Sequence, residues 1–178
     1  MTSWLEDSTI TDSLVKKGFS EQSAESRASM LRACGKVLLG ANSNPLRAWW
    51  VPGRIEVLGK HTDYAGGRSL LCATDSGVAL VARPRDDARV TIRDLRSGLE
   101  TSFEIAPDLE ATAGDWTNYP HTVARRLSRN FGPLKGVDIV FKSDLPIAAG
   151  MSSSSALIVA FSIVILHTNG LPESKLYS

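Results

Sequence analysis

Four consecutive serines follow a Gly-Met pair in LPIAAGMSSSSAL, residues 145–157, hereafter the serine loop. The loop lies between an expected strand and an expected helix. The first N–H groups of a helix have no partner within it, and the helix dipole adds partial positive charge there. Small residues let a phosphate approach the backbone, and hydroxyl groups can donate hydrogen bonds or bind Mg²⁺. The loop therefore predicts a site for a nucleotide triphosphate, built from Gly150, Met151, Ser152, Ser153, Ser154 and Ser155.

A plainer interpretation is that Ser152 or Ser153 caps the helix and the other serines form a polar lead-in. Two other motif classes are excluded. A nucleophile elbow requires Gly two residues after the serine, but Ser154 follows Ser152 at that spacing. A Walker A loop requires four residues between its glycines, and five separate Gly53 from Gly59.

A second group of reactive side chains lies in PGRIEVLGKHTDYAGG, residues 52–67, hereafter the signature segment. Planar polar groups beside an aromatic face are suited to binding a sugar. An arginine near the reacting hydroxyl can stabilise negative charge as it develops. The candidates are Arg54, Lys60, His61, Asp63 and Tyr64. The alternative is a salt-bridged hairpin that turns at Gly66–Gly67.

Helices and strands must hold these two segments in place. Helical spacing of apolar residues predicts helices over 21–39, 116–129 and 153–168, the second capped by Asp115 and weakened by Pro120. Short runs rich in Val, Ile and Leu between Gly, Pro and Asp predict strands. These runs are 47–51, 54–59, 69–74, 77–85, 89–94, 100–105 and 137–143. The expected class is α+β with a mostly antiparallel sheet.

Composition and charge limit the classes of partner that the chain is expected to bind. The chain has 178 residues, 43% of them hydrophobic, which suits one globular domain. A net charge of +1 argues against nucleic acid or a membrane surface as the main partner, so a small molecule is expected. Two cysteines, the lack of a signal-peptide pattern and an apolar run (156–166) too short to cross a bilayer favour a reducing cytoplasm.

Taken together, the two segments resemble motifs of the GHMP kinases, and among these most closely the galactokinases. The signature segment is similar to the galactokinase signature, the serine loop to the family's phosphate loop, and DWTNYPHTVARRL (115–127) to a helix start between them. The resemblance implies an N-terminal domain like domain 2 of ribosomal protein S5. It also implies a sugar kinase that uses ATP and Mg²⁺ to phosphorylate the anomeric hydroxyl of galactose or a related sugar.

The resemblance also assigns roles to single residues. Arg54 matches the arginine beside the phosphorylated hydroxyl, and His61, Asp63 and Tyr64 match residues that hold the sugar. Ser154 matches the expected Mg²⁺ contact. Lys60 stands where galactokinases carry an acidic residue, and Glu56 stands where Asn is usual. Lys60 would suit an anionic sugar, or would pair with Glu56.

The family's catalytic base, its acidic metal ligand and a Gly-rich motif are expected beyond residue 178. Residues 1–178 are therefore expected to be a partial domain without the C-terminal domain, inactive by itself. A non-catalytic sensor of sugar or nucleotide with the same fold is the alternative. The particular sugar and the oligomeric state stay open.

Overall fold

A single five-stranded sheet forms the centre of the domain. The computed structural model describes residues 8–40, 44–59, 63–146 and 150–171. The strands are β1 (Arg47–Leu58), β2 (Leu70–Pro84), β3 (Arg89–Asp94), β4 (Glu100–Glu104) and β5 (Val137–Ser143), in the order β1-β2-β5-β3-β4. Only β3 and β5 pair in parallel, and the other three pairings are antiparallel. The predicted α+β class with a mostly antiparallel sheet is confirmed.

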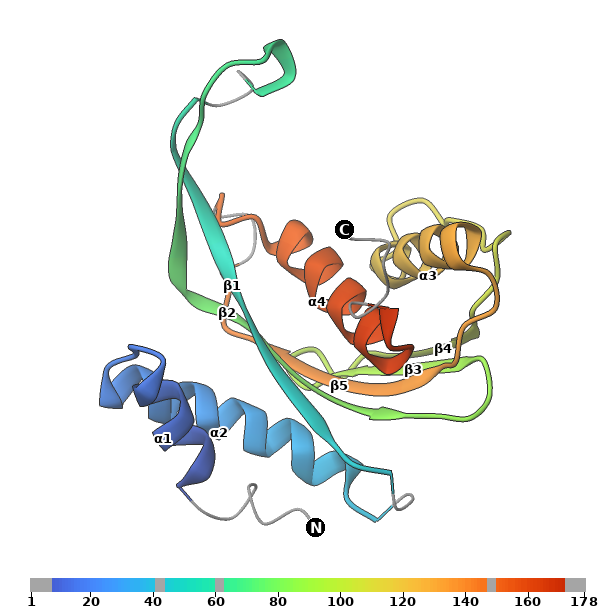
Figure 1. Cartoon of the computed structure of the whole chain (residues 1–178), viewed down its shortest axis with the longest axis horizontal. Coiled ribbons are helices and arrows are strands. Elements are labelled where there is room, and N and C mark those ends of the chain that lie inside the picture. Colours follow the sequence, from blue (N-terminus) through green and yellow to red (C-terminus); the bar gives the residue numbers. More distant parts are fainter. Residues whose placement is uncertain (1–7, 41–43, 60–62, 147–149, 172–178) are drawn as a thin grey trace.

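Helices cover both faces of this sheet (Figure 1). On one face lie α1 (Thr9–Lys16) and α2 (Glu21–Leu38), and on the other α3 (Asn118–Phe131) and α4 (Ser153–Thr168). Successive strand side chains point to opposite faces. In β2, Ala79 and Val81 therefore join the core under α2, while Val78 and Leu80 join the core under α4. None of the helices that the structure describes is long and apolar enough to cross a membrane.

Most helix predictions are confirmed, with one correction. The bounds of α4 agree with the expected 153–168, and α2 ends one residue earlier than expected. The expected helix over 116–129 begins instead at Asn118, and Asp115 does not cap it. The Asp115 carboxylate accepts from the Thr117 amide, 2.9 Å away, in the turn before the helix. Pro120 is tolerated because it lies in the first turn, where no N–H partner is needed.

The expected breaks at Pro52–Gly53 and Asp75–Ser76 were wrong, since 47–58 forms one strand and 70–84 another. Between the pairs Pro52/Gly77 and Arg54/Ala73, the single residue Gly53 faces the three residues Thr74–Ser76. The interruption is therefore a bulge within a long hairpin rather than its end. Pro52 fits because β1 is an edge strand. The strands 89–94 and 137–143 have the expected bounds.

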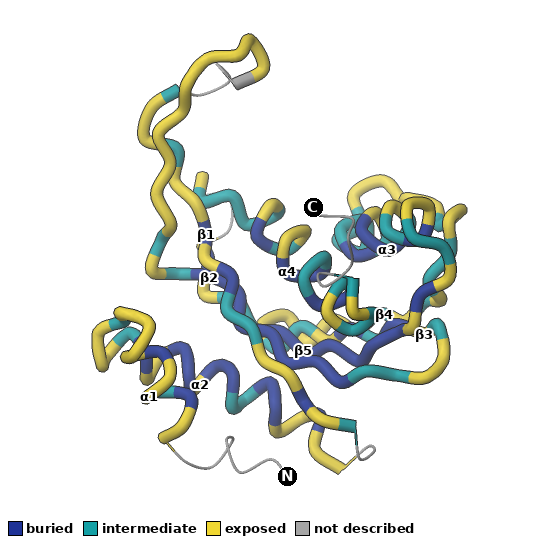
Figure 2. The backbone as a smooth tube through the Cα atoms, viewed as in Figure 1, coloured by how far each residue is buried: buried dark blue, intermediate teal, exposed yellow. Residues whose placement is uncertain are grey.

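The far half of this hairpin extends beyond the helices (Figure 2). Its large apolar side chains are exposed although the strand pairing continues to Leu58 and Leu70. They are Ile55, Val57, Leu58, Leu70 and Leu71. A short 3₁₀ turn, Asp63–Ala65, lies at its tip.

Candidate functional site

A cavity of about 320 Å³ lies where the hairpin bulge meets the start of α4. Its walls come from three elements that are far apart in the sequence. They are Val51, Pro52, Gly53 and Arg54 of β1, Leu71, Cys72 and Ala73 of β2, and Ser152, Ser155, Ala156 and Val159 at α4. The cavity thus joins part of the signature segment to part of the serine loop.

Arg54 is the positively charged side chain of this cavity. It is exposed, and its guanidinium pairs with no residue that the structure describes. Its backbone N–H is held by the Met151 carbonyl at 3.2 Å, which ties the strand to the serine loop. The side chain is therefore free to meet an anionic ligand while its backbone is fixed.

The start of α4 presents unpaired backbone donors. Ser152 is the N-cap residue in a left-handed conformation, with φ 53° and ψ 42°, and its side chain makes no capping bond within the described chain. The first helical bond runs from the Ala156 amide to the Ser152 carbonyl, at 2.9 Å. The amides of Ser153, Ser154 and Ser155 therefore have no partner within the helix. This geometry disfavours the capping interpretation and fits a phosphate group.

Left-handed backbone at Ser152 supports the same interpretation. Residues other than glycine rarely adopt a positive φ, and such strain gathers at ligand sites. Gly150, two residues earlier, also has a positive φ of 71°. No group of three or more His, Cys, Asp or Glu side chains gathers as a metal site in the described ranges.

Among the described residues of the signature segment, those after Arg54 do not line this cavity. Lys60 and His61 lie outside the described residues, as do positions 147–149 of the serine loop. Asp63 and Tyr64 lie in the 3₁₀ turn at the hairpin tip, which projects away from α4 (Figure 1). Tyr64 is 83% exposed. Their predicted sugar contacts stay predictions.

Sequence reasoning predicted Ser152 and Ser155 but missed the β2 wall of the cavity, together with Ala156 and Val159 of α4. Cys72 and Ala73 reach it because they pair with Ile55 and Arg54 across the hairpin. Aligning the two strands of the hairpin in the sequence, with a bulge at Gly53, would have placed Cys72 and Ala73 opposite Ile55 and Arg54. Val159 enters from α4 one helical turn after Ser155, which helix periodicity predicts.

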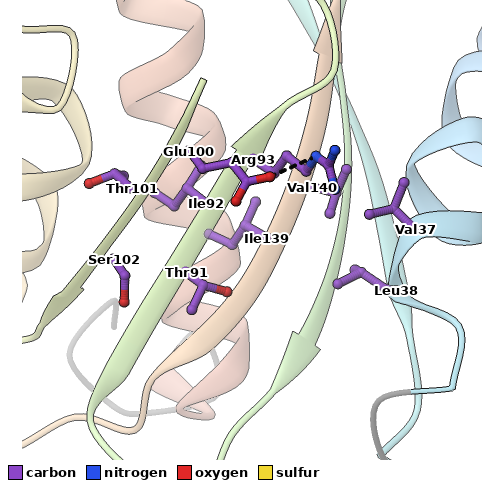
Figure 3. Close-up of a pocket in the computed structure, with 10 residues that line it drawn as sticks. All are labelled: Val37, Leu38, Thr91, Ile92, Arg93, Glu100, Thr101, Ser102, Ile139 and Val140. Atoms are coloured by element: carbon purple, nitrogen blue, oxygen red, sulfur yellow. Dashed lines mark ion pairs between the residues drawn. The ribbon is translucent and has the colours of Figure 1, made fainter. Parts of the chain in front are cut away.

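A second hollow of about 450 Å³ lies between α2 and the β3–β4 hairpin (Figure 3). Its charged side chains, Arg93 and Glu100, pair with each other across the strands at 3.0 Å. No candidate residue of the serine loop or signature segment lines it. It is a solvated sheet face and not the site of the predicted chemistry.

Two family models match the two segments that form the cavity. Residues 36–84 match the galactokinase galactose-binding signature, and residues 118–177 match the N-terminal domain of the GHMP kinases. Over these two segments the chain resembles the GHMP kinases, and the galactokinases among them.

Curated relatives of this chain include two galactokinases. The chain is 38% identical to that of Chloroflexus aggregans and 36% identical to that of Chloroflexus aurantiacus, each over 116 residues. These alignments cover 65% of the chain and 30% of each relative. The chain thus spans about a third of the length of the curated relatives that it matches.

Solved structures of two kinases share the fold. Lactococcus lactis galactokinase complexed with galactose has a TM-score of 0.66 at 24% identity, covering 80% of this chain and 37% of that one. Methanococcus jannaschii mevalonate kinase has a TM-score of 0.52 at 15% identity, with coverages of 71% and 41%. These matches show the GHMP kinase fold, including the sheet that carries the cavity.

Proposed function

We propose that this chain is the ATP- and sugar-binding part of a sugar kinase of the galactokinase type. The observation that carries the proposal is the shared cavity, in which Arg54 lies with Ser152 and Ser155. A donor of phosphoryl groups and an acceptor hydroxyl would meet between these residues. Positioning and charge neutralisation are the main contributions that proteins make to phosphoryl transfer.

Each element has a distinct task in this proposal. Bound Mg²⁺·ATP supplies the phosphoryl group and its cation. The amides at the start of α4 and the serine hydroxyls would hold the phosphates. The Ser154 hydroxyl oxygen would contact Mg²⁺. The Arg54 guanidinium orients the acceptor hydroxyl and balances the negative charge that develops between the two substrates. Val51, Leu71 and Val159 give the cavity apolar walls beside these groups.

Galactose or a related sugar is the proposed acceptor, phosphorylated at its anomeric hydroxyl. The match to the galactose-binding signature over residues 36–84 supports this class. Lys60, His61, Asp63 and Tyr64 are the proposed sugar contacts beyond Arg54. An acidic residue at position 60 is usual in galactokinases, so comparing galactose with galacturonate in the wild type and Lys60→Glu tests the acceptor.

Calorimetric titration with Mg²⁺·ATP tests the nucleotide half of the proposal. Ser154→Ala should weaken binding roughly tenfold while costing at most about 1 kcal/mol of folding stability. Ser162→Ala is the matched control, because Ser162 lies on the same helix and its hydroxyl donates only to the Ile158 carbonyl, at 2.8 Å. Equal affinities for both variants would show that the serine loop does not bind phosphate.

The sensor alternative binds the same ligands without turnover. No carboxylate lines the cavity among the residues that the structure describes. The 178-residue chain should therefore bind Mg²⁺·ATP without releasing ADP when sugar is added. Sugar-dependent ADP release by a longer product of the same gene would exclude the sensor.

A further inference from the structure

The first described end of the serine loop is fixed to the hairpin bulge. The Asp144 carboxylate, directly before the loop, accepts from the Gly77 amide at 2.7 Å. The Asp144 amide in turn donates to the Gly77 carbonyl at 3.2 Å. Ser143, the last residue of β5, donates its hydroxyl to the same carbonyl at 3.2 Å. Gly77 thus receives three contacts from the two residues that lead into the loop.

The second described end of the loop reaches the same bulge from the other strand. The Met151 carbonyl accepts from the Arg54 amide at 3.2 Å. Gly53 lies beneath both ends, since a Cβ there would fall 2.5 Å from Leu145 Cδ2 and 3.0 Å from the Met151 oxygen. The two ends therefore converge on the residue next to Arg54.

The bulge itself is anchored from the opposite face of the sheet. Arg27 of α2 is 2% exposed and donates to the Asp75 carboxylate at 2.6 Å. Its guanidinium also lies over the rings of Phe19 and Trp50, at 4.3 and 4.7 Å from their centroids. This cluster holds the bulge in place. The Gly77 amide, which donates to the Asp144 carboxylate, therefore cannot move away without disturbing the cluster.

We propose that Asp144 is a positioning residue for the nucleotide. Its carboxylate sets where the serine loop begins relative to Arg54, and so aligns the α4 donors with the acceptor side of the cavity. The inference rests on the proposed function, because the ligand that it positions is Mg²⁺·ATP. The acceptor must lie at this position but need not be charged, so an amide oxygen in the same place can replace it.

Three substitutions at Asp144 separate position from charge. Asp144→Ala removes the acceptor and should weaken Mg²⁺·ATP binding roughly tenfold in calorimetric titration. Asp144→Asn keeps an oxygen at the same distance and should stay within about threefold of the wild type. Asp144→Glu keeps the charge but moves the carboxylate by one methylene, so it should bind less tightly than Asp144→Asn.

Asp87→Ala is the control for general loss of a carboxylate. Asp87 accepts from the Arg89 amide at 3.2 Å and pairs with Arg85 at 2.6 Å, beyond the other end of β2. The Asp87→Ala variant should bind Mg²⁺·ATP with the wild-type affinity, even if its Tm is lower. Amide hydrogen exchange gives a readout that needs no ligand. Exchange at Gly77 should accelerate in Asp144→Ala and stay near the wild-type rate in Asp144→Asn.

Two negative results have different meanings. An unsubstituted chain that does not bind Mg²⁺·ATP would refute the proposed function, and the role of Asp144 would fall with it. Binding by the unsubstituted chain that Asp144→Ala leaves intact would refute the positioning role alone. So would an Asp144→Asn variant as weak as Asp144→Ala, because the acceptor position would then be irrelevant.

Discussion

The two halves of the β1–β2 hairpin have similar sequences and opposite environments. The near half, Arg47–Pro52 with Gly77–Pro84, lies between the helical layers and supplies core residues to both faces. The far half, Arg54–Leu58 with Leu70–Ala73, is also rich in Ile, Val and Leu but is mostly exposed. Apolar strand residues are therefore not sufficient evidence for a buried strand, since burial requires a second layer.

The candidate site lies at the boundary between the two halves. There Gly53 opposes three residues of β2, and the strand changes from covered to exposed within a few residues. The near half fixes the backbone, while the boundary leaves Arg54 and Cys72 accessible to a ligand. This arrangement gives the cavity a rigid base without burying its charged side chain.

Replacing one leucine by alanine in each half should give the largest difference in stability loss between the two halves. Leu80 in the near half is fully buried, so Leu80→Ala should cost about 2–5 kcal/mol of stability. Leu58 in the far half is 66% exposed, and Leu58→Ala should change stability by less than about 0.5 kcal/mol. Urea unfolding midpoints measure both. Similar losses would mean that the far half is covered in solution.

Adding a methyl group at the boundary should have an intermediate effect. Gly53→Ala would place a Cβ against Leu145, Thr74 and Met151, costing about 1–3 kcal/mol. It should also weaken Mg²⁺·ATP binding, because it displaces both ends of the serine loop. Gly66→Ala at the tip meets no atom within 4 Å and should cost about 1 kcal/mol for its positive φ alone. Unchanged ATP affinity in Gly53→Ala would contradict the close approach.

The two cysteines allow the boundary to be probed without mutation. Cys34 of α2 is buried against the sheet, and burial raises the pKa of its thiol to about 12. Cys72 is exposed and lines the cavity. Iodoacetamide at pH 8 should therefore modify Cys72 and spare Cys34. Mg²⁺·ATP should slow the reaction, as followed by mass spectrometry, and modification at an equal rate with ligand would place the nucleotide elsewhere.

Protonation of Asp75 at low pH should destabilise the bulge. This is the smallest of the effects that we expect. A hydrogen bond from Arg27 is the main cause that holds the pKa of Asp75 below its ordinary value of 3.8, and Ser23 contributes. Because the folded pKa is the lower one, the ionised carboxylate stabilises the fold fully above about pH 4. This contribution is lost as pH falls through the folded value. The fall in Tm between about pH 5 and 2 should be shallower in Asp75→Asn, and identical slopes would exclude this contribution.

The sequence by itself determined the elements whose signals are local. Short runs with Val and Ile at 89–94 and 137–143 and the apolar run after Ser152 predicted β3, β5 and α4 with the observed bounds. The two binding segments were also predicted, because Gly-Met before four serines and clustered polar residues are properties of short stretches. The start of α3 was less well predicted, since Asp115 forms an equally good bond within a turn.

Only the tertiary structure decided how the binding segments meet. Pro52–Gly53 and Asp75–Ser76 were interpreted as strand ends because each carries residues that interrupt isolated strands. Pairing across the hairpin turned both into one bulge, and this brought Cys72 beside Arg54. Ser152 at the N-cap of α4 has a left-handed backbone, and its side chain makes no capping bond to the described chain. No local sequence pattern encodes this conformation. Register, bulges and helix-end geometry depend on contacts between distant residues, and these arise only when the layers pack.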